Sequence, residues 1–248
     1  MAMKRGLITL SFNKEKIASS REYPFNIPAL SNFSSLEFHP KVTYLSGENG
    51  MGKSTLIEAI AVSSGFNPEG GSRNFNFATR ASHSVLHEYI RIARAPIRHK
   101  DGFFLRGESF FNLGTNIEYL DKESDKKVID DYGGVSLHEQ SHGEAFWALF
   151  MHRFSGNALY ILDEPEAALS PTRQMAMLTR MHELIQQNAQ FIIATHSPIV
   201  MAYPDATIYE LTEKGIHKTS YTETANYKIS RHFINDHENM VKILLGDA

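Results

Sequence analysis

The sequence contains no cysteine, no long apolar run and no strong excess of charge of either sign. The absence of cysteine excludes disulfide bonds and thiolate metal sites, and it fits a reducing compartment. No stretch approaches the roughly 18 uninterrupted apolar residues of a membrane-spanning helix. The first ten residues carry basic side chains without the apolar centre of a signal peptide. We therefore expect a soluble, cytoplasmic protein with no direct membrane insertion.

The formal net charge of −3 gives no global basic excess of the kind that favours nucleic acid. The chain also has no internal repeat and no low-complexity linker. Its 248 residues, of which 42% are hydrophobic, are enough for one large domain or two small ones with a sizeable core.

Compact apolar segments alternate along the chain with segments of helical period. Strands are expected at Gly6–Phe12, Val42–Leu45, Gly102–Leu105, Ala158–Leu162 and Phe191–Ala194, with a late hairpin at Ile208–Leu211 and Ile216–Thr219. Helices are expected at Ser54–Val62, Ser82–Ala93, Ser109–Leu120, Gly143–Phe154 and Pro171–Gln187, with two short helices at the end. This alternation predicts an α/β fold in which a mostly parallel sheet is flanked by helices.

A glycine-rich segment directly follows the strand expected at Val42–Leu45 and fits the pattern G-x-x-x-x-G-K-[ST]. It consists of Gly47, Glu48, Asn49, Gly50, Met51, Gly52, Lys53 and Ser54. Glycines let several backbone N–H groups face one anion, and the following helix offers its N-terminus to the same phosphates. Lys53 should reach the β- and γ-phosphates of a nucleotide, Ser54 should ligate Mg²⁺, and Thr55 should support the α-phosphate. The alternative is a glycine-rich turn without a ligand, but the preceding strand and following helix favour a phosphate loop.

Two adjacent carboxylates, Asp163 and Glu164, follow the strand expected at Ala158–Leu162. Ligands of open α/β sheets bind at the carboxyl ends of the strands. Asp163 would hold Mg²⁺ through water opposite Ser54, and Glu164 would polarise the attacking water as general base. The alternative is a strand that simply ends in an acidic turn, and the phosphate loop favours the catalytic interpretation.

His196 follows the strand expected at Phe191–Ala194, which we expect beside the acidic strand. An imidazole at that position can contact a γ-phosphate and sense the state of the nucleotide. A histidine that is only packed or solvated is the alternative. The sequence thus predicts Lys53, Glu164 and His196 as the catalytic residues of an ATPase.

Taken together, these segments resemble the ABC-type ATPase superfamily. The segment Ser141–Glu144, ahead of Asp163, looks like the S-x-G-E version of the family's signature, and Ala167–Ser170 matches its D-loop. The resemblance implies a P-loop ATPase of ABC type with an N-terminal antiparallel β subdomain and a small helical subdomain near residues 82–140, in a single domain of residues 1–248. It further implies ATP and Mg²⁺ at two sites between the subunits of a homodimer. The residues expected to act in trans are Ser141, His142, Gly143 and Glu144.

Two further assignments depend on the same resemblance. The segment Phe103–Glu108 has the strand-then-polar form of the family's Q-loop, which places Glu108 where many members carry glutamine and implies that it orients Mg²⁺ or water. Tyr23 and Phe25 stand where the family places its adenine-stacking aromatic residue. We assign Phe25 to the ATP site, with packing in the core as the alternative.

The segments Asp163–Glu166 and Thr195–Pro198 look like the OLD, RecF and SMC side of the superfamily. No long heptad coiled coil separates Ser54 from Ser141, and the stretch after His196 is too short for the nuclease domain of OLD proteins. The chain is therefore similar to a small stand-alone group of bacterial predicted ATPases.

Several functions remain open at this point. The leading one is an ATP-driven homodimer that regulates an unidentified effector protein, in DNA repair or anti-phage defence. A DNA partner is a second interpretation of the basic cluster, for which a solvated helix face is the simpler explanation. A transporter-energising subunit is a third, against which the absence of the sequence LSGGQ counts, and a non-hydrolytic nucleotide switch is a fourth. The basic cluster comprises Arg91, Arg94, Arg98, His99 and Lys100.

Overall fold

The computed structural model describes residues 6–13, 15, 17, 19, 21–73, 84–107, 129, 134 and 140–246. The helix expected at Ser109–Leu120, and Glu108 of the expected Q-loop, lie outside these residues. The side chain of His142 is outside them as well, although its backbone is part of a helix.

The larger sheet confirms the expected α/β architecture. Its inner strands run parallel because each is reached through a crossover, and the edge strands β10 and β4 are antiparallel to their neighbours. Every residue of the central strands β3 and β7 is buried, as expected for strands covered on both faces. In spatial order the strands are β10 (Gly215–Thr219), β9 (Thr207–Thr212), β3 (Val42–Gly47), β8 (Gln190–Ala194), β7 (Ala158–Asp163), β6 (Asp101–Arg106) and β4 (Gly71–Ser72).

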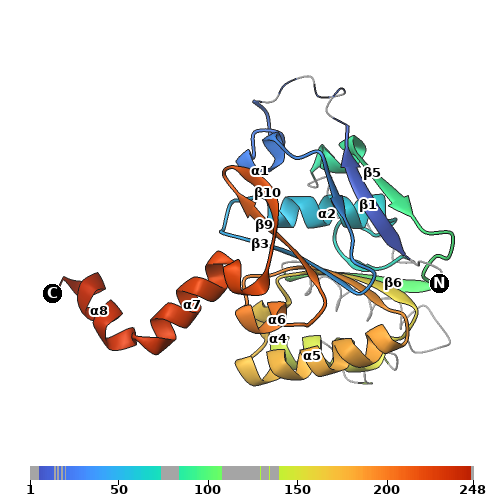
Figure 1. Ribbon diagram of the computed structural model, residues 1–248. Coiled ribbons are helices and arrows are strands. Elements are labelled where there is room, and N and C mark those ends of the chain that lie inside the picture. The colour runs from blue at the N-terminus through green and yellow to red at the C-terminus, as the bar shows by residue number, and fades with distance from the viewer. Residues whose placement is uncertain are drawn as a thin grey trace.

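A smaller antiparallel sheet lies on one side of the larger one, with helix α2 (Lys53–Ser63) between the two (Figure 1). Its order is β2 (Ser35–Glu37), β1 (Leu7–Phe12), β5 (Ile90–Arg94). Helix α2 carries apolar residues on most of its surface because both sheets cover it, and its core includes Leu56, Ile57 and Ile60. The smaller sheet is the antiparallel N-terminal subdomain that the resemblance implied.

The helix expected at Ser82–Ala93 is wrong. The described part of this segment forms a 3₁₀ helix, η2 (Val85–Tyr89), followed by strand β5. Ile90 and Ile92 alternate with Arg91, which is the period of a strand, and β1 pairs with them. Pairing with a strand some 80 residues earlier therefore overrode the weak helical period of this segment.

Helices cover the other face of the larger sheet (Figure 1). Helix α4 (His142–Ala148) continues into a π-helical turn, Leu149–Arg153, and packs with α5 (Pro171–Gln186) and α6 (Pro198–Met201). The core here is aromatic: the rings of Phe154 and Tyr160 stack with centroids 4.0 Å apart. Short helices α1 (Pro28–Ser31), η6 (Pro165–Ala168) and η7 (Tyr221–Glu223) connect the larger elements.

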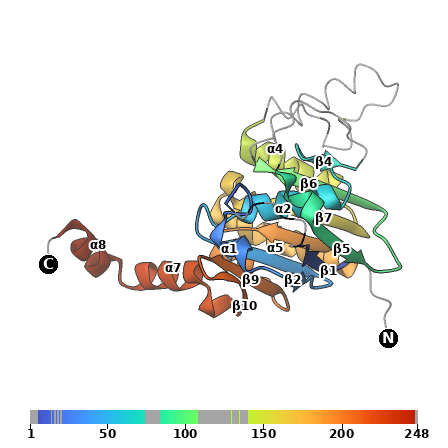
Figure 2. The same ribbon diagram turned by 90° about the horizontal axis from the view of Figure 1, so that it is seen from above.

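The last two helices, α7 (Ala225–Asn235) and α8 (His237–Leu245), project away from the body as an arm (Figures 1 and 2). Neither helix buries a side chain. The apolar residues that the arm exposes are Ile229, Phe233, Ile234, Val241, Ile243, Leu244 and Leu245. Across the described ranges, no helix combines the length and apolar character that crossing a bilayer requires.

Candidate nucleotide site

The carboxyl ends of four neighbouring parallel strands meet at one edge of the larger sheet. The pairing register aligns Arg106 of β6 with Asp163 of β7, then Ala194 of β8, and finally Leu45 of β3. The segments that follow these strands therefore emerge side by side. The phosphate loop, the acidic pair and His196 are brought together for this reason, as the sequence predicted.

Positive φ angles shape the phosphate loop. Gly47, Gly50 and Gly52 have φ angles of 141°, 80° and 89°, a region that favours glycine. A Cβ atom on Gly47 would lie 2.4 Å from the carbonyl oxygen of Leu211, and one on Gly52 would lie 2.8 Å from Cγ2 of Ile27. The loop is thus held tightly against β9 and the segment before α1, and glycine is required at both places.

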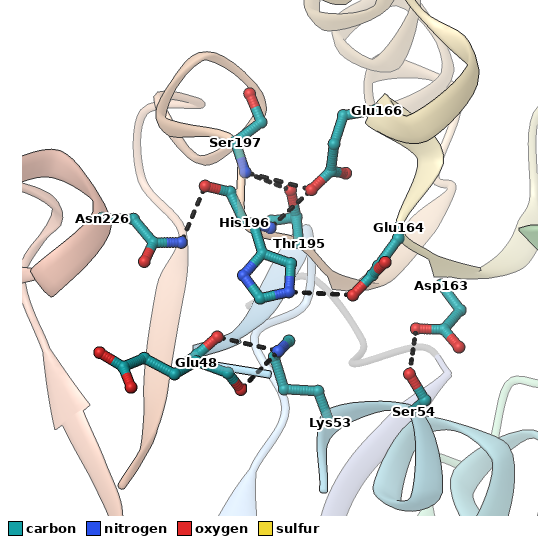
Figure 3. Close-up of polar contacts among 11 residues, drawn as sticks. Glu48, Lys53, Ser54, Asp163, Glu164, Glu166, Thr195, His196, Ser197 and Asn226 are labelled. Atoms are coloured by element: carbon teal, nitrogen blue, oxygen red, sulfur yellow. Dashed lines mark hydrogen bonds and ion pairs between the residues drawn. The ribbon is translucent and has the colours of Figure 1, made fainter. Parts of the chain in front are cut away.

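Lys53 is buried and points back into its own loop (Figure 3). Its Nζ donates to the carbonyl oxygens of Gly47 at 2.8 Å and Glu48 at 3.0 Å. Burial lowers the pKa of Lys53, and the nearby carboxylates Glu164 and Asp163 oppose that effect. The ammonium group is therefore fixed at the mouth of the loop, where it can attract a phosphate.

Ser54 and Asp163 form the second polar pair of the site (Figure 3). The hydroxyl of Ser54 donates to Oδ1 of Asp163 at 3.2 Å. Burial raises the pKa of Asp163 from 3.8 to about 7, while the bond from Ser54 and the positive charges of Arg106 and Lys53 lower it. The negative charge of this buried carboxylate is only partly balanced by its neighbours, so the carboxylate should attract a cation strongly.

The residues of this pair fit Mg²⁺. One hydroxyl and one carboxylate oxygen are hard ligands, and Mg²⁺ in proteins commonly takes one or two such groups and completes its shell with phosphate oxygens and water. The described residues contain no group of three or more His, Cys, Asp or Glu side chains able to hold a metal alone. A magnesium ion here would therefore depend on the nucleotide.

Glu164 and His196 form a carboxylate–imidazole pair at the centre of the site (Figure 3). Nε2 of His196 lies 2.9 Å from Oε1 of Glu164, as in a bond that the imidazole N–H donates. Glu164 has a φ of 49°, in the left-handed region that ordinary residues rarely occupy. Such backbone strain concentrates at functional sites because it aims a side chain that the regular strand would direct elsewhere.

Two residues that sequence reasoning did not assign also hold His196 in place. Oε1 of Glu166 accepts hydrogen bonds from the backbone N–H groups of His196 and Ser197. Nδ2 of Asn226, at the start of α7, donates to the carbonyl oxygen of His196 at 2.8 Å. The histidine segment is therefore linked both to the turn after β7 and to the base of the C-terminal arm (Figure 3).

Arg106 is a third residue that sequence reasoning missed. It lies at the end of β6 beside a cavity of about 290 Å³ that Ser54, Asp163 and Glu164 also line. Nη1 of Arg106 donates to Oε2 of the buried Glu58 at 2.6 Å, which fixes the guanidinium close to Asp163. Its position in the expected Q-loop segment, three strands away from the phosphate loop, was the signal available in the sequence.

The two aromatic candidates for stacking on the adenine ring of ATP differ in their surroundings. The ring of Phe25 packs against Phe12 and meets Tyr89 edge-on at 4.7 Å, within the core between the sheets. Tyr23 is 61% exposed, and its hydroxyl lies 3.1 Å from Oγ1 of Thr55 in the first turn of α2. Tyr23 thus makes a polar contact with the first turn of the phosphate-loop helix, whereas Phe25 packs into the apolar core that this helix shares.

The expected signature forms the N-terminal cap and first turn of α4. Ser141 caps α4 by accepting from the backbone N–H of Glu144, whose carboxylate accepts from both the backbone N–H and the hydroxyl of Ser141. A Cβ atom on Gly143 would lie 2.5 Å from the carbonyl oxygen of Ala168, so glycine allows α4 to approach η6. Ser141 lines neither cavity beside the phosphate loop of its own chain.

The chain also has relatives among known proteins and solved structures. A family model described as "AAA domain, putative AbiEii toxin, Type IV TA system" matches residues 71–202, just over half of the chain. The matched range begins after the phosphate loop and includes the signature segment, the acidic pair and His196.

Individual named relatives have low sequence identity to this chain. The chain is similar to the energy-coupling factor transporter ATP-binding protein EcfA2 of Methanospirillum hungatei, with 26% identity over 219 residues, covering 78% of this chain and 51% of that protein. It thus spans about half the length of this relative. It is also similar to the cytochrome c biogenesis ATP-binding export protein CcmA of Brucella abortus, with 26% identity over 163 residues, covering 62% of this chain and 72% of that protein.

Among solved structures, the fold is similar to that in "An inward-facing conformation of a putative metal-chelate type ABC transporter", with a TM-score of 0.51 and 15% identity, covering 92% of this chain and 88% of that one. At this identity the likeness concerns the fold alone. Assignment to the OLD, RecF and SMC branch stays a prediction. The chain belongs to the AAA-domain family that the model describes, within the superfamily of ABC-type ATPases.

Proposed function

We propose that the chain hydrolyses MgATP at a site completed by a second copy of itself, and that this cycle acts on an effector protein. The observation that carries the proposal is the Glu164–His196 pair, held next to Lys53 and to the Ser54–Asp163 pair at the ends of neighbouring strands. A carboxylate base, a phosphate-binding lysine and a hydroxyl–carboxylate pair are the groups that nucleotide hydrolysis requires.

Each residue has a distinct task in this proposal. Lys53 and the loop N–H groups bind the phosphates of ATP, and Tyr23 stacks on the base. Ser54 and Asp163 hold Mg²⁺, which neutralises phosphate charge when bound. Glu164 orients a water molecule and accepts its proton as the water oxygen bonds to the γ-phosphorus and the bond to the β-phosphate oxygen breaks. His196 fixes the carboxylate of Glu164 by its 2.9 Å hydrogen bond.

A second copy supplies Ser141 in the proposed dimer. Support comes from the family resemblance and from the exposure of Ser141, which lines neither cavity beside its own phosphate loop. Residues 1–248 would then act as a single domain in the cytoplasm, with two composite sites in each dimer. His142 and Glu108 stay predicted contributors to these sites.

Two candidate functions differ in the kind of effector protein on which the chain acts. The description of the matched family, which includes a toxin and a toxin–antitoxin system, supports a defence setting. The similarity to EcfA2, a transporter ATP-binding protein, and to CcmA, an ATP-binding export protein, supports the second candidate, the energising subunit of a transporter. Purification of the tagged chain from detergent-solubilised cells separates the two, because a stoichiometric membrane subunit is expected only for the transporter.

Glu164→Gln tests the hydrolytic dimer. Glutamine keeps the shape of the side chain but cannot accept the proton, so we expect a dimer that persists with MgATP and turns over at least about 100-fold more slowly. Light scattering measures the dimer, and phosphate release measures the turnover. The control is Glu183→Gln, the same chemical change at an exposed position on α5.

Two outcomes would contradict the proposal separately. If Glu164→Gln stays monomeric with saturating MgATP, the composite site is wrong. If it hydrolyses ATP at the rate of the Glu183→Gln control, Glu164 is not the base. Adding Ser141→Arg to Glu164→Gln should return the protein to a monomer that still binds ATP, because only the contact in trans is blocked.

A further inference from the structure

A cavity of about 220 Å³ lies at the opposite edge of the larger sheet from the phosphate loop. It is lined by Gly6, which precedes β1 of the smaller sheet, and by His99, which precedes β6 of the larger sheet. Ser64, at the carboxyl end of α2, also lines it, whereas Lys53 begins the same helix. The length of α2 therefore separates this cavity from the phosphate loop by about 16 Å.

Three arginines converge on this cavity from different elements. Arg73 follows β4, Arg94 ends β5, and Arg98 lies in the connection from β5 to β6. Burial lowers the pKa of Arg73, and the charges of Arg94 and Arg98 lower it further. The three positive charges repel one another, and a bound anion would relieve this repulsion.

Carboxylates of the described residues supply little compensating negative charge. Asp101 is the carboxylate that raises the pKa of Arg73, yet its two oxygens already accept hydrogen bonds from Arg153 at 2.6 and 3.0 Å. Residues 1–5 and 74–83 adjoin this region in the sequence, outside the described residues, and contain no Asp or Glu. The positive charge is thus largely uncompensated within the described structure.

The wall of the cavity also contains buried donors without a partner. Ser64 is 6% exposed, and its hydroxyl makes no hydrogen bond within the described part of the chain. The same is true of the buried Nε of Arg73. A buried polar atom without a partner is costly, typically by about 1–3 kcal/mol, so such atoms commonly mark a site for a ligand or an ordered water.

A purely structural role for the arginines explains part of this arrangement. Nη2 of Arg94 donates to the carbonyl oxygen of Ser63 at 2.6 Å, and Nη1 of Arg73 donates to that of His99 at 3.3 Å. Each guanidinium has five N–H donors, so these bonds leave most of them available. Arg98 is exposed and lines the cavity. Within the described residues its side chain makes no hydrogen bond to a backbone carbonyl, so a structural role of this kind does not explain its position.

We propose that this cavity binds a phosphate-type oxyanion through Arg73, Arg94, Arg98 and Ser64. Guanidinium groups match the oxygens of phosphate in pairs, and a buried hydroxyl adds a fixed donor. A volume of about 220 Å³ is below the range of about 300–1,000 Å³ typical of sites for drug-sized ligands, which suits one phosphate group. The group comes either from free phosphate and small esters or from a nucleic-acid backbone.

This site also redefines the basic cluster expected from the sequence. The cluster is not a helix face, because Arg91 and Arg94 belong to strand β5. Arg94, Arg98 and His99 line the cavity, whereas Arg91 and Lys100 do not. Arg91 thus offers a control with the same charge on the same strand.

The test compares Arg98→Glu with Arg91→Glu in the full chain. Broadening of the ³¹P resonance of inorganic phosphate at millimolar concentration measures binding, and the phosphate loop contributes equally in both variants. We expect Arg98→Glu to weaken phosphate binding by at least about tenfold relative to Arg91→Glu, because it replaces a charge-assisted donor with a repulsive charge. Circular dichroism and thermal melts confirm that both variants fold, and Arg94→Gln provides a second, charge-neutralising variant.

Competition with a fluorescent 20-base-pair DNA duplex distinguishes the two sources. Displacement of phosphate by the duplex, with salt-sensitive duplex binding that Arg98→Glu abolishes and Arg91→Glu retains, identifies a nucleic-acid backbone. Phosphate binding without competition identifies free phosphate or a small ester. The proposal is overturned if both variants bind phosphate and duplex equally, or if the unmodified chain binds neither. Since the readout involves no ATP, failure here leaves the proposed ATPase untouched.

Discussion

Replacing Asp163 with asparagine tests the electrostatics of the candidate site most directly. Asp163 is 7% exposed, and burial raises its pKa from 3.8 to about 7. In the unfolded chain the carboxyl returns to its ordinary pKa. Between these two values the folded state binds more protons than the unfolded state, so stability falls as the pH rises. The penalty is absent well below pH 4 and complete above pH 7.

The size of the effect follows from the same shift. Each tenfold change in proton affinity corresponds to about 1.4 kcal/mol, so the complete penalty is about 4 kcal/mol. Asparagine keeps the shape of the side chain and can accept the hydrogen bond from Ser54, but it never ionises. Its stabilising effect should be larger at pH 8 than at pH 5 by about 3 kcal/mol, because less than half of the penalty has developed at pH 5.

Urea denaturation without nucleotide or magnesium measures this difference. Asp205→Asn is the control, because Asp205 is an exposed carboxyl whose pKa the bond from Lys41 lowers, so its removal should not stabilise the protein at pH 8. Equal effects of Asp163→Asn at pH 5 and pH 8, or a loss of stability at pH 8, would refute the reasoning. With saturating MgATP, the unmodified protein should be more stable than Asp163→Asn, because a charged carboxylate binds Mg²⁺ more strongly than a neutral amide does.

Three further predictions concern other parts of the molecule. Gly143→Ala should destabilise the fold by about 1–3 kcal/mol, since its Cβ would lie 2.5 Å from a carbonyl oxygen of η6. Gly107→Ala, whose Cβ would meet no atom of the described residues within 4 Å, should leave the melting temperature unchanged. Tyr23→Ala should weaken ATP binding by about 1 kcal/mol and Tyr23→Phe by less, and equal dissociation constants by fluorescence titration would remove this ring from the site. Asp101→Asn should lower the melting temperature at pH 7. Although burial acts in the opposite direction, the ion pair with Arg153 holds the pKa of Asp101 below its usual value. The stabilisation from this carboxylate is therefore lost on acidification, and the difference in melting temperature should fade as the pH falls below about 4.

The central part of the site could be predicted from the sequence because its signals are local. A strand, a glycine pattern and a lysine within one short segment predict the phosphate loop, and the strand-end position of Asp163 and Glu164 predicts that they meet it. The same reasoning placed His196 one strand away. The late hairpin of β9 and β10 was also recognisable, since two apolar runs flank a short turn.

The remaining features depend on contacts between distant segments. Glu166 accepts a hydrogen bond from the backbone of His196 at a turn in which Glu164 adopts a left-handed conformation. No pattern of residues in the sequence predicts that conformation. Arg106 contributes through an ion pair with Glu58, 48 residues earlier. The segment of strand β5 was predicted as a helix because the alternation of Ile90 and Ile92 with arginine was too short to outweigh the helical period. Its extended conformation depends on pairing with β1, which the local sequence does not show.

The cap of helix α4 sets a condition on any contact in trans. The hydroxyl of Ser141 has a single proton, and Oε2 of Glu144 holds it at 2.6 Å. A phosphate on a second chain would compete with this carboxylate for the same proton, and the two anions would repel each other. A weakly charged ligand would lose that competition, whereas a fully ionised triphosphate with its metal could win it. Any contact that Ser141 makes in trans would therefore have to displace or share its hydrogen bond to Glu144.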